Sequence, residues 1–236
     1  MELLRNFDAR YEPKSLDDIV FTQCKQRNHL RDDVSGRSGM PDSGINGILL
    51  VGNTGSGKST LARLLPNWIE VARGGEEAHP TIHQITSSNS GVALLENLER
   101  QVSLVTYCQK FHYIVLDEVD LLSTAAMDKL KSVMNIGYKS CIWIMTTNDF
   151  GRISKPVVSR CHTYFLNHAP SSEWLPLYRR ILSDHGITDI SVKGMLEQID
   201  LCNGCGRSVI DAAKRIILDR DEEASNQVVN LTTNVV

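Results

Sequence analysis

The 236-residue sequence lacks an apolar run that could span a bilayer, which takes about 20 consecutive apolar residues. The chain begins MELLRNFDAR, which is too charged for a secretory signal peptide. Its six cysteines are irregularly spaced and form no dense disulfide framework, as is typical of a reducing compartment. These absences argue against a membrane protein. They predict a cytoplasmic one, or one in the host cytoplasm if a phage encodes it.

The chain also lacks a strong excess of either charge, because its formal net charge is −3. This balance gives no general sign of nucleic-acid binding, although a local basic stripe can coexist with it. Internal repeats and low-complexity segments are absent as well. The hydrophobic fraction of 42% is ordinary for a globular protein, and the length allows one large domain or one domain with a small appendage.

A phosphate-binding loop is the clearest motif that is present. From Gly47 to Leu65 the sequence reads GILLVGNTGSGKSTLARLL, so a short apolar strand leads into G-x-x-x-x-G-K-[ST] and then into a helix. Glycines let backbone N–H groups curl around a phosphate, and the helix start adds its positive end. Lys58 can reach the β- and γ-phosphates, and the Ser59 hydroxyl can ligate Mg²⁺. The expected nucleotide-binding residues are Gly52, Asn53, Thr54, Gly55, Ser56, Gly57, Lys58, Ser59 and Thr60.

Strand-like and helix-like segments alternate around this loop, which predicts a five-stranded parallel sheet with helices on both faces. The helix after the loop is expected to be cut short or kinked at Pro66. A later amphipathic helix is expected to carry an apolar stripe from Val92 to Val105. The expected strands are 48–51, 81–86, 113–116, 140–147 and 162–166.

Beyond the last strand the pattern becomes purely helical and predicts a small all-α domain. Its helices are expected near residues 172–184, 190–201 and 205–220. The expected division is therefore an α/β domain over 1–168, a helical domain over 169–220 and a tail over 221–236. The tail could be disordered, an edge strand or a segment that binds a partner, and disorder is the expectation because it lies at the terminus.

Polar side chains follow two of the buried strands. Asp117 and Glu118 come directly after YIVL, where an Asp can hold the Mg²⁺ shell and the next acid can polarise an attacking water. Asn148 ends the following strand, where its amide can contact the γ-phosphate and that water. Alone, such residues are often solvated turns or Asx turns. Because the carboxyl ends of parallel strands share one edge, all three are expected beside Lys58 and Ser59.

The order of motifs GNTGSGKST, LDEVD, TTND, SRC and a late G-x-x-R resembles the clamp-loader branch of the AAA+ ATPases. That branch includes the small subunits of replication factor C and the phage clamp-loader ATPase. The N-terminal RYEPKSLDDIV is similar to the segment that precedes the nucleotide site in this branch. The resemblance covers about Tyr11 to Ile217. It implies a P-loop NTPase (AAA+) fold with a helical lid, and hydrolysis of ATP with Mg²⁺.

The resemblance also implies roles for individual residues. Arg160, in the triplet Ser-Arg-Cys, would act in trans as an arginine finger on ATP bound to a neighbouring subunit. Arg207 would be the sensor-2 residue that contacts the phosphates from the lid, and Asn148 would be sensor 1. The residues implied near the adenine are Tyr11, Pro13 and Val20.

Three departures from this branch affect the expected partners. The family continues into an all-α collar on the order of one hundred residues long, a domain-sized piece, whereas this sequence ends shortly after the lid. Ser90 lies near the position where the family has a basic residue for the DNA backbone, and Lys131 stands where the family has an Arg pair. We expect self-association or assembly with related AAA+ subunits, DNA contacted through Lys131, and a sliding clamp or another replication protein as partner.

Two alternatives keep the fold but change the function. A collarless AAA+ module could form rings or filaments on DNA, as helicase loaders and transposition regulators do. A non-catalytic nucleotide-dependent scaffold is disfavoured because every expected catalytic residue is present. Cys202 and Cys205 form a C-x-x-C, which could suggest zinc or redox chemistry. No second pair is suitably spaced for a tetrahedral zinc site, so two buried or half-buried thiols are expected.

Overall fold

The computed structural model describes residues 7–136, 138–166 and 169–233 and divides the chain into two compact units. One unit is Pro13–Asn167, and the other combines Met1–Glu12 with His168–Val236. The expected boundary between residues 168 and 169 touches positions outside the described residues. The described part of the N-terminal segment before Pro13 groups with the helical unit, whereas the sequence placed it in the α/β domain.

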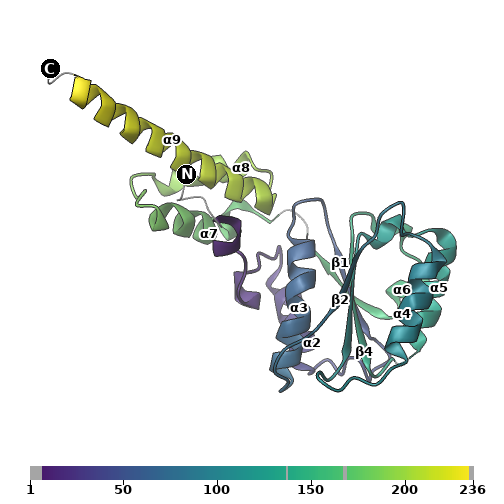
Figure 1. Ribbon diagram of the computed structural model, residues 1–236. Helices are drawn as coiled ribbons and strands as arrows, with labels where there is room; N and C mark the ends of the chain where they lie inside the picture. The colour runs from purple at the N-terminus through teal and green to yellow at the C-terminus, as the bar shows by residue number, and fades with distance from the viewer. Residues whose placement is uncertain (1–6, 137, 167–168, 234–236) are drawn as a thin grey trace. The chain divides into compact units, whose positions relative to one another are not determined.

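A five-stranded parallel sheet forms the centre of the larger unit (Figure 1). Its strand order is β2-β3-β4-β1-β5. This confirms the predicted sheet. In β1 the register pairs Val51 with Thr147 of β4 and with Phe165 of β5, so the strand ends align at one edge. The strands are β1 (Gly47–Val51), β2 (Thr81–Gln84), β3 (His112–Asp117), β4 (Cys141–Thr147) and β5 (Cys161–Phe165).

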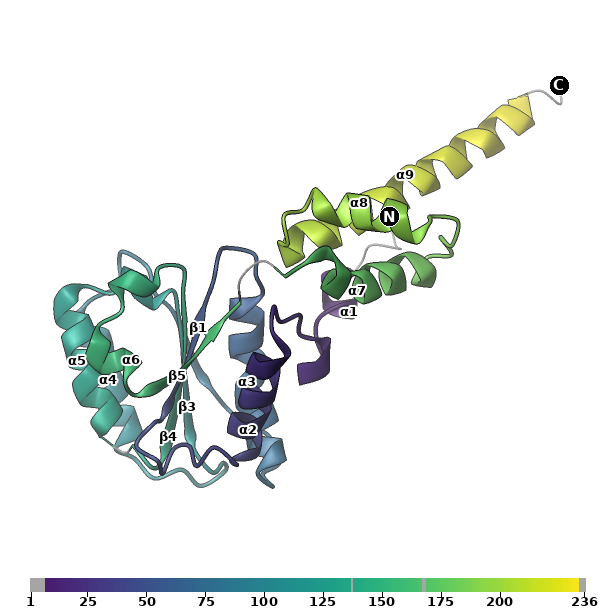
Figure 2. The ribbon, with the colours of Figure 1, turned by 180° about the vertical axis from the view of Figure 1, so that it is seen from behind.

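Helices cover both faces of this sheet (Figures 1 and 2). On β1, Ile48 and Leu50 belong to the apolar cluster under α2 and α3, and Leu49 and Val51 belong to the cluster under α4, α5 and α6. All five residues of β1 are buried, because each face of a parallel sheet is covered. The helices of this unit are η1 (Leu16–Asp18), α2 (Cys24–Ser35), α3 (Lys58–Ala72), α4 (Val92–Val102), η2 (Val119–Leu121), α5 (Thr124–Asn135), η3 (Phe150–Arg152) and α6 (Lys155–Val158).

The ends of two expected helices differ in the structure. α3 is not cut short at Pro66 but continues to Ala72, because its buried face outweighs a proline penalty of about 3 kcal/mol, and a kink at Pro66, the other expectation, stays a prediction. α4 ends at Val102, and Val105 is 74% exposed instead of extending the apolar stripe. Beyond Val102 the chain leaves the helix and packs near the start of β3. The Leu104 carbonyl oxygen lies 2.7 Å from His112 Nε2, at the start of that strand.

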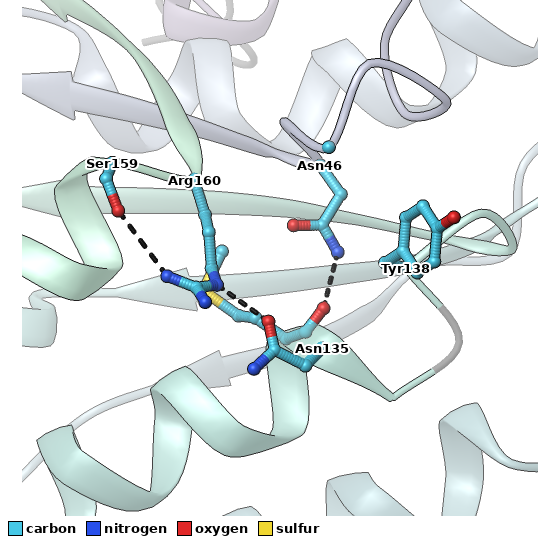
Figure 3. A pocket seen from close by; sticks show the side chains of 7 residues that line it. Asn46, Asn135, Tyr138, Ser159 and Arg160 are labelled. Atoms are coloured by element: carbon cyan, nitrogen blue, oxygen red, sulfur yellow. Dashed lines mark hydrogen bonds between the residues drawn. The ribbon is translucent and has the colours of Figure 1, made fainter.

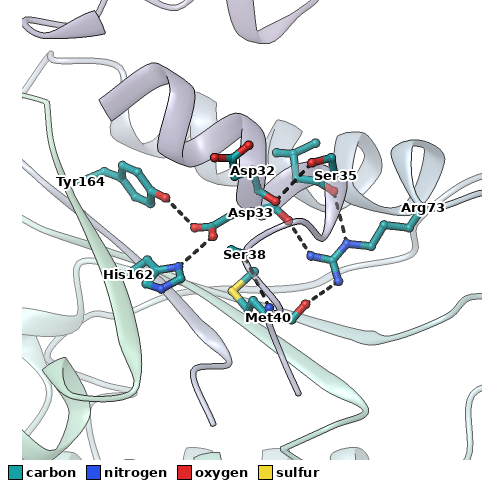
Figure 4. Close-up of polar contacts among 9 residues, drawn as sticks. Asp32, Asp33, Ser35, Ser38, Met40, Arg73, His162 and Tyr164 are labelled. Carbon is teal, nitrogen blue, oxygen red and sulfur yellow. Dashed lines mark hydrogen bonds and ion pairs between the residues drawn. The ribbon is translucent and has the colours of Figure 1, made fainter. Parts of the chain in front are cut away.

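A buried carboxylate connects α2 to the edge strand β5 (Figure 4). Asp33 is 1% exposed and accepts hydrogen bonds from Tyr164 Oη at 2.5 Å and His162 Nδ1 at 2.8 Å. Arg73, just past α3, donates to the Asp33 backbone oxygen and, at 2.8 Å, to the Met40 oxygen. These bonds fix the segment before β1 against the sheet.

We expect Asp33→Asn to lower the free energy of unfolding by about 2 kcal/mol, since hydrogen bonds to a charged group contribute roughly 1.5–3 kcal/mol. Asp32→Asn is the matched control. Its carboxylate pairs with Arg37 on the surface, where ion pairs contribute about 0–1 kcal/mol. Urea denaturation followed by circular dichroism compares the two, and equal small losses would contradict the anchoring role of Asp33.

The second unit is helical in its described residues. Phe7 and Tyr11 are buried, with ring centroids 5.0 Å apart, and Tyr11 Oη donates to Asp184 Oδ2 at 3.2 Å. No helix among residues 7–136, 138–166 and 169–233 is long and apolar enough to cross a membrane. The helices are α1 (Phe7–Arg10), α7 (Ser171–Asp184), α8 (Val192–Asp200) and α9 (Gly206–Thr233).

The C-terminal segment differs from its expectation. The sequence predicts a helix to about residue 220 and then a tail with no fixed structure. In the structure α9 continues without a break to Thr233. No glycine or proline interrupts this stretch, so nothing local stops the helix. Residues 234–236 of the expected tail lie outside the described residues.

Candidate active site

The phosphate-binding loop joins the carboxyl end of β1 to the start of α3, as its sequence predicts. A Cβ on Gly52 would lie 2.3 Å from the Leu166 carbonyl oxygen, so only glycine fits there. Gly55 and Gly57 have φ of +82° and +88°, the left-handed region that glycine adopts without strain. Gly52 therefore allows the loop to approach Leu166, the residue after β5, and Gly55 and Gly57 allow the loop to turn.

Lys58 begins α3 and is 6% exposed. Its Nζ donates to the Asn53 carbonyl oxygen at 2.8 Å, across the loop. Burial lowers the pKa of Lys58, and the charges of Asp117, Asp120 and Glu118 partly oppose that shift. Lys58 thus lies among carboxylates at the edge of the sheet where β1 and β3 end.

The loop also contains a polar atom that fits a bound phosphate. Ser56 Oγ is buried and has no hydrogen-bond partner among the described residues. Buried hydroxyls are normally hydrogen-bonded, so an orphan here indicates a missing partner. Gly57 at the N-terminus of α3 has open space around it. The Ser56 hydroxyl, unpaired in the described part of the chain, the open space at Gly57 and the buried Lys58 together suit the phosphates of a nucleotide.

Ser59 and Asp117 lie side by side, as predicted for a Mg²⁺ site. Ser59 Oγ donates to Asp117 Oδ1 at 2.9 Å, and Thr146 Oγ1 donates to the same oxygen at 2.5 Å. A hydroxyl and a carboxylate are oxygen ligands of the kind Mg²⁺ prefers, together with phosphate and water. The residues present therefore fit a magnesium ion bound with a nucleotide.

Glu118 has an uncommon backbone conformation that the sequence could not reveal. Its φ of 63° and ψ of 49° lie in the left-handed region, which costs a non-glycine residue on the order of 1 kcal/mol. Its backbone N–H donates to Thr146 Oγ1 at 2.9 Å. Neighbouring β4 thus holds Glu118 in this conformation, and the residue is half-buried.

Asp120 is a site residue that the sequence reasoning missed. It is 7% exposed, and its Oδ1 accepts from Thr147 Oγ1 at 2.9 Å and from the Asn148 backbone N–H at 3.1 Å. It therefore fixes the position of Asn148, which is exposed at the end of β4. The available signal was a third acid two residues after Glu118, in the run Asp117-Glu118-Val119-Asp120.

Arg160 lies at the opposite edge of the sheet from the loop of its own chain. Its carbonyl oxygen accepts from the backbone N–H groups of Asn46, at 3.1 Å, and Gly47, at 2.9 Å, where β1 begins. The loop follows Val51, at the other end of β1. β1 has five residues, each rising about 3.3 Å, and this length of strand separates Arg160 from the loop. Arg160 therefore belongs to a different surface of this unit from Lys58.

Arg160 lines an open cavity of about 390 Å³, together with polar and apolar residues (Figure 3). Arg160 Nε donates to Asn135 Oδ1 at 2.7 Å, and Nη1 donates to the Pro156 carbonyl oxygen at 2.6 Å. Asn46 and Tyr138 complete this wall of the cavity. The guanidinium is thus held on its own chain by neutral acceptors, with no carboxylate among its hydrogen-bond partners in the part of the chain that the structure describes.

The remaining predicted site residues are distributed over both units. Tyr11 belongs to the helical unit, and Pro13 and Val20 belong to the α/β unit. Arg207 is exposed in the first turn of α9, and Lys131 is exposed on α5. Their expected roles toward adenine, phosphate and DNA stay predictions.

Residues 48–168 match the family model for the ATPase family associated with various cellular activities (AAA). Replication factor C small subunit 1 of Pyrobaculum arsenaticum is 26% identical over 181 residues, which cover 75% of this chain and 52% of that protein. The replication factor C small subunit of Archaeoglobus fulgidus is 26% identical over 217 residues, or 89% of this chain and 64% of that one. The chain thus spans about half to two thirds of these relatives.

Solved structures agree on the fold. The RuvB Holliday junction branch migration motor of Thermotoga maritima superimposes with a TM-score of 0.61 at 19% identity, covering 92% of this chain and 67% of that one. A DNA polymerase III gamma subunit-related protein of the same organism gives a TM-score of 0.54 at 13% identity, covering 78% and 58%. At such identities the likeness shows only a shared arrangement of sheet, helices and helical lid.

Proposed function

Because the chain belongs to the AAA family of ATPases and is related to replication factor C small subunits, we propose that it hydrolyses ATP at sites shared between neighbouring subunits. The assembly would act on DNA replication or recombination complexes, as a clamp-loader-like ATPase. The names of the relatives, a replication factor and a Holliday junction motor, support work on DNA.

The observation that carries the proposal is the position of Arg160. Its backbone is hydrogen-bonded to Asn46 and Gly47 at the start of β1, whereas Lys58 lies past the end of that strand. Arg160 therefore cannot serve the phosphate loop of its own α/β unit. A neighbouring subunit that brings its Arg160 to this loop would supply the missing charge.

The residues around the loop have separable roles in this reaction. The loop N–H groups and Lys58 would bind the phosphates, and Ser59 and Asp117 would hold Mg²⁺, which would neutralise phosphate charge. The Glu118 carboxylate orients the water that attacks the γ-phosphate and accepts its proton. Asn148 contacts that water or the γ-phosphate, and the neighbour's Arg160 stabilises the charge that develops in the transition state.

The function is tested by measuring ATP hydrolysis with and without primed DNA and a sliding clamp, together with electron microscopy of ATP-bound particles. Stimulation that needs both additions is expected of a clamp loader. Filaments or rings formed on DNA without a clamp would instead indicate the collarless regulator, and nucleotide binding without hydrolysis would indicate a scaffold. Full activity from isolated monomers would contradict shared sites.

Asp120→Ala should lower kcat by roughly 10- to 100-fold while leaving the Kd for ATP nearly unchanged, because a small displacement of a positioning group has effects of this size. The variant removes the acceptor for the Asn148 N–H and the Thr147 hydroxyl. Asp128→Ala, an exposed carboxylate on α5, is the control. An equal kcat in both variants would show that Asp120 does not position Asn148.

A further inference from the structure

Two cysteines of the helical unit flank the turn between α8 and α9. The backbone N–H of Cys205 donates to the Cys202 carbonyl oxygen at 3.0 Å, and both are thiols. Asn203 and Gly204 between them have φ of 49° and 69°. A turn closed in this way keeps its first and fourth Cα atoms within about 7 Å. Disulfides span Cα distances of about 4.4–6.8 Å, a range that overlaps the separation such a turn allows.

Packing holds the end of this turn in place. Gly206, the first residue of α9, is buried against Trp174 of α7, and a Cβ there would lie 2.5 Å from the indole. The Cys205 carbonyl oxygen accepts from the Val209 N–H at 3.0 Å, which is a hydrogen bond of the first turn of α9. Cys205 is thus the residue at the helix start, and its position is set by the core of the helical unit.

The surroundings make the two thiols unequal. Burial alone would raise the pKa of Cys205, but hydrogen bonds from the Ser208 hydroxyl and from the backbone N–H groups of Ser208 and Arg207 lower it overall. Burial raises the pKa of Cys202, and the nearby charge of Cys205 raises it further. Thiolates are the reactive form, and helix N-termini favour them. In an exchange with a disulfide, Cys205 would therefore be the attacking thiol and Cys202 the resolving thiol.

We propose that Cys202 and Cys205 are a redox-active dithiol that small-molecule disulfides such as oxidised glutathione convert reversibly to an intramolecular disulfide. The Cys205 thiolate attacks one sulfur of glutathione disulfide, forming a mixed disulfide and releasing one glutathione thiolate. Cys202 then loses its proton and attacks the Cys205 sulfur, which forms the bridge and releases the second glutathione. The two cysteines lose two electrons and two protons, and the oxidant gains them.

Cys108, Cys141 and Cys161 lack this arrangement. Cys141 and Cys161 are buried in the α/β unit, and burial raises the pKa of Cys161 to about 12. Cys108 is exposed, so it serves as an internal control for a lone accessible thiol.

Oxidation of the pair would also remove the charge that the Cys205 thiolate places two residues before Arg207. That consequence for Arg207 rests on the proposed function, whereas the chemistry of the cysteine pair does not.

The test incubates the full chain in buffers of graded oxidised-to-reduced glutathione ratio, followed by acid quenching, alkylation and peptide mass mapping. The peptide that holds Cys202 and Cys205 should lose two hydrogens and two alkylation sites, and dithiothreitol should restore both. Cys108 should carry only a mixed disulfide. Two separate glutathione adducts on the pair, or an unmodified pair beside a modified Cys108, would overturn the proposal whatever the ATPase activity is.

Two serine variants test which sulfur reacts first. Cys202→Ser should trap glutathione on Cys205 as a stable mixed disulfide, since the resolving thiol is missing. Cys205→Ser should acquire glutathione on Cys202 more slowly. The reverse order of rates would contradict the assignment of Cys205 as the nucleophile. Circular dichroism of both variants checks the helical content, and the wild-type mapping needs no variant at all.

Discussion

Glu118→Gln should bind ATP with a nearly unchanged Kd and hydrolyse it about 100- to 10,000-fold more slowly than the wild type, the range expected for a lost general base. The substitution isolates the carboxylate. The bond that holds this residue in place runs from its backbone N–H to Thr146 Oγ1 and does not involve the side chain. Glutamine has the same length and can still hydrogen-bond to water, but it cannot accept the proton.

A fluorescent ATP analogue gives the Kd of this variant, and phosphate release gives its turnover. Glu96→Gln is the matched control, because Glu96 is an exposed glutamate on α4 of the same unit. Normal turnover in Glu118→Gln would exclude it as the base. Lost binding would show instead that the carboxylate contributes to the nucleotide site in the ground state.

Arg160→Ala should lower kcat by about 10³- to 10⁵-fold with ATP binding retained, since arginine fingers contribute rate enhancements of this size. The side chain lies at the edge of β1 away from its own loop, so the lost charge is one that a neighbouring subunit would have received. Steady-state phosphate release, measured at saturating ATP and high protein concentration, provides the comparison.

Asn135→Ala distinguishes an action of the Arg160 guanidinium on a neighbouring subunit from a structural role within its own chain. It removes the acceptor of the Arg160 Nε hydrogen bond and leaves the arginine in place. If Arg160 acts on a neighbour, this variant keeps most of the activity, because the guanidinium must leave Asn135 to reach another subunit. If Asn135→Ala is as inactive as Arg160→Ala, the arginine serves the structure of its own chain.

The sheet and the phosphate loop could be predicted because their signals are local. A buried parallel strand is an apolar run, and the loop needs glycines, lysine and serine at fixed spacing, so the sequence contains both patterns. The pair Ser59 and Asp117 followed from the rule that parallel strands end at one edge. The structure places these two oxygens 2.9 Å apart.

The features that could not be predicted from the sequence depend on contacts between distant segments. The left-handed conformation of Glu118 requires Thr146 on the next strand, and the role of Asp120 requires Asn148. The continuation of α3 through Pro66 depends on burial of its inner face. Local propensity includes none of these tertiary contacts, so it predicted a helix cut short or kinked at Pro66 and assigned no role to Asp120.

Mixing Arg160→Ala subunits with Lys58→Ala subunits tests the shared site most directly. Each variant alone should be inactive, because Arg160→Ala lacks the arginine finger and Lys58→Ala lacks the phosphate-binding lysine. In the mixture, an intact loop from one variant can meet an intact Arg160 from the other, so the predicted result is recovered ATP hydrolysis with a maximum at an intermediate ratio. No recovery at any ratio would contradict a site completed by the neighbouring subunit.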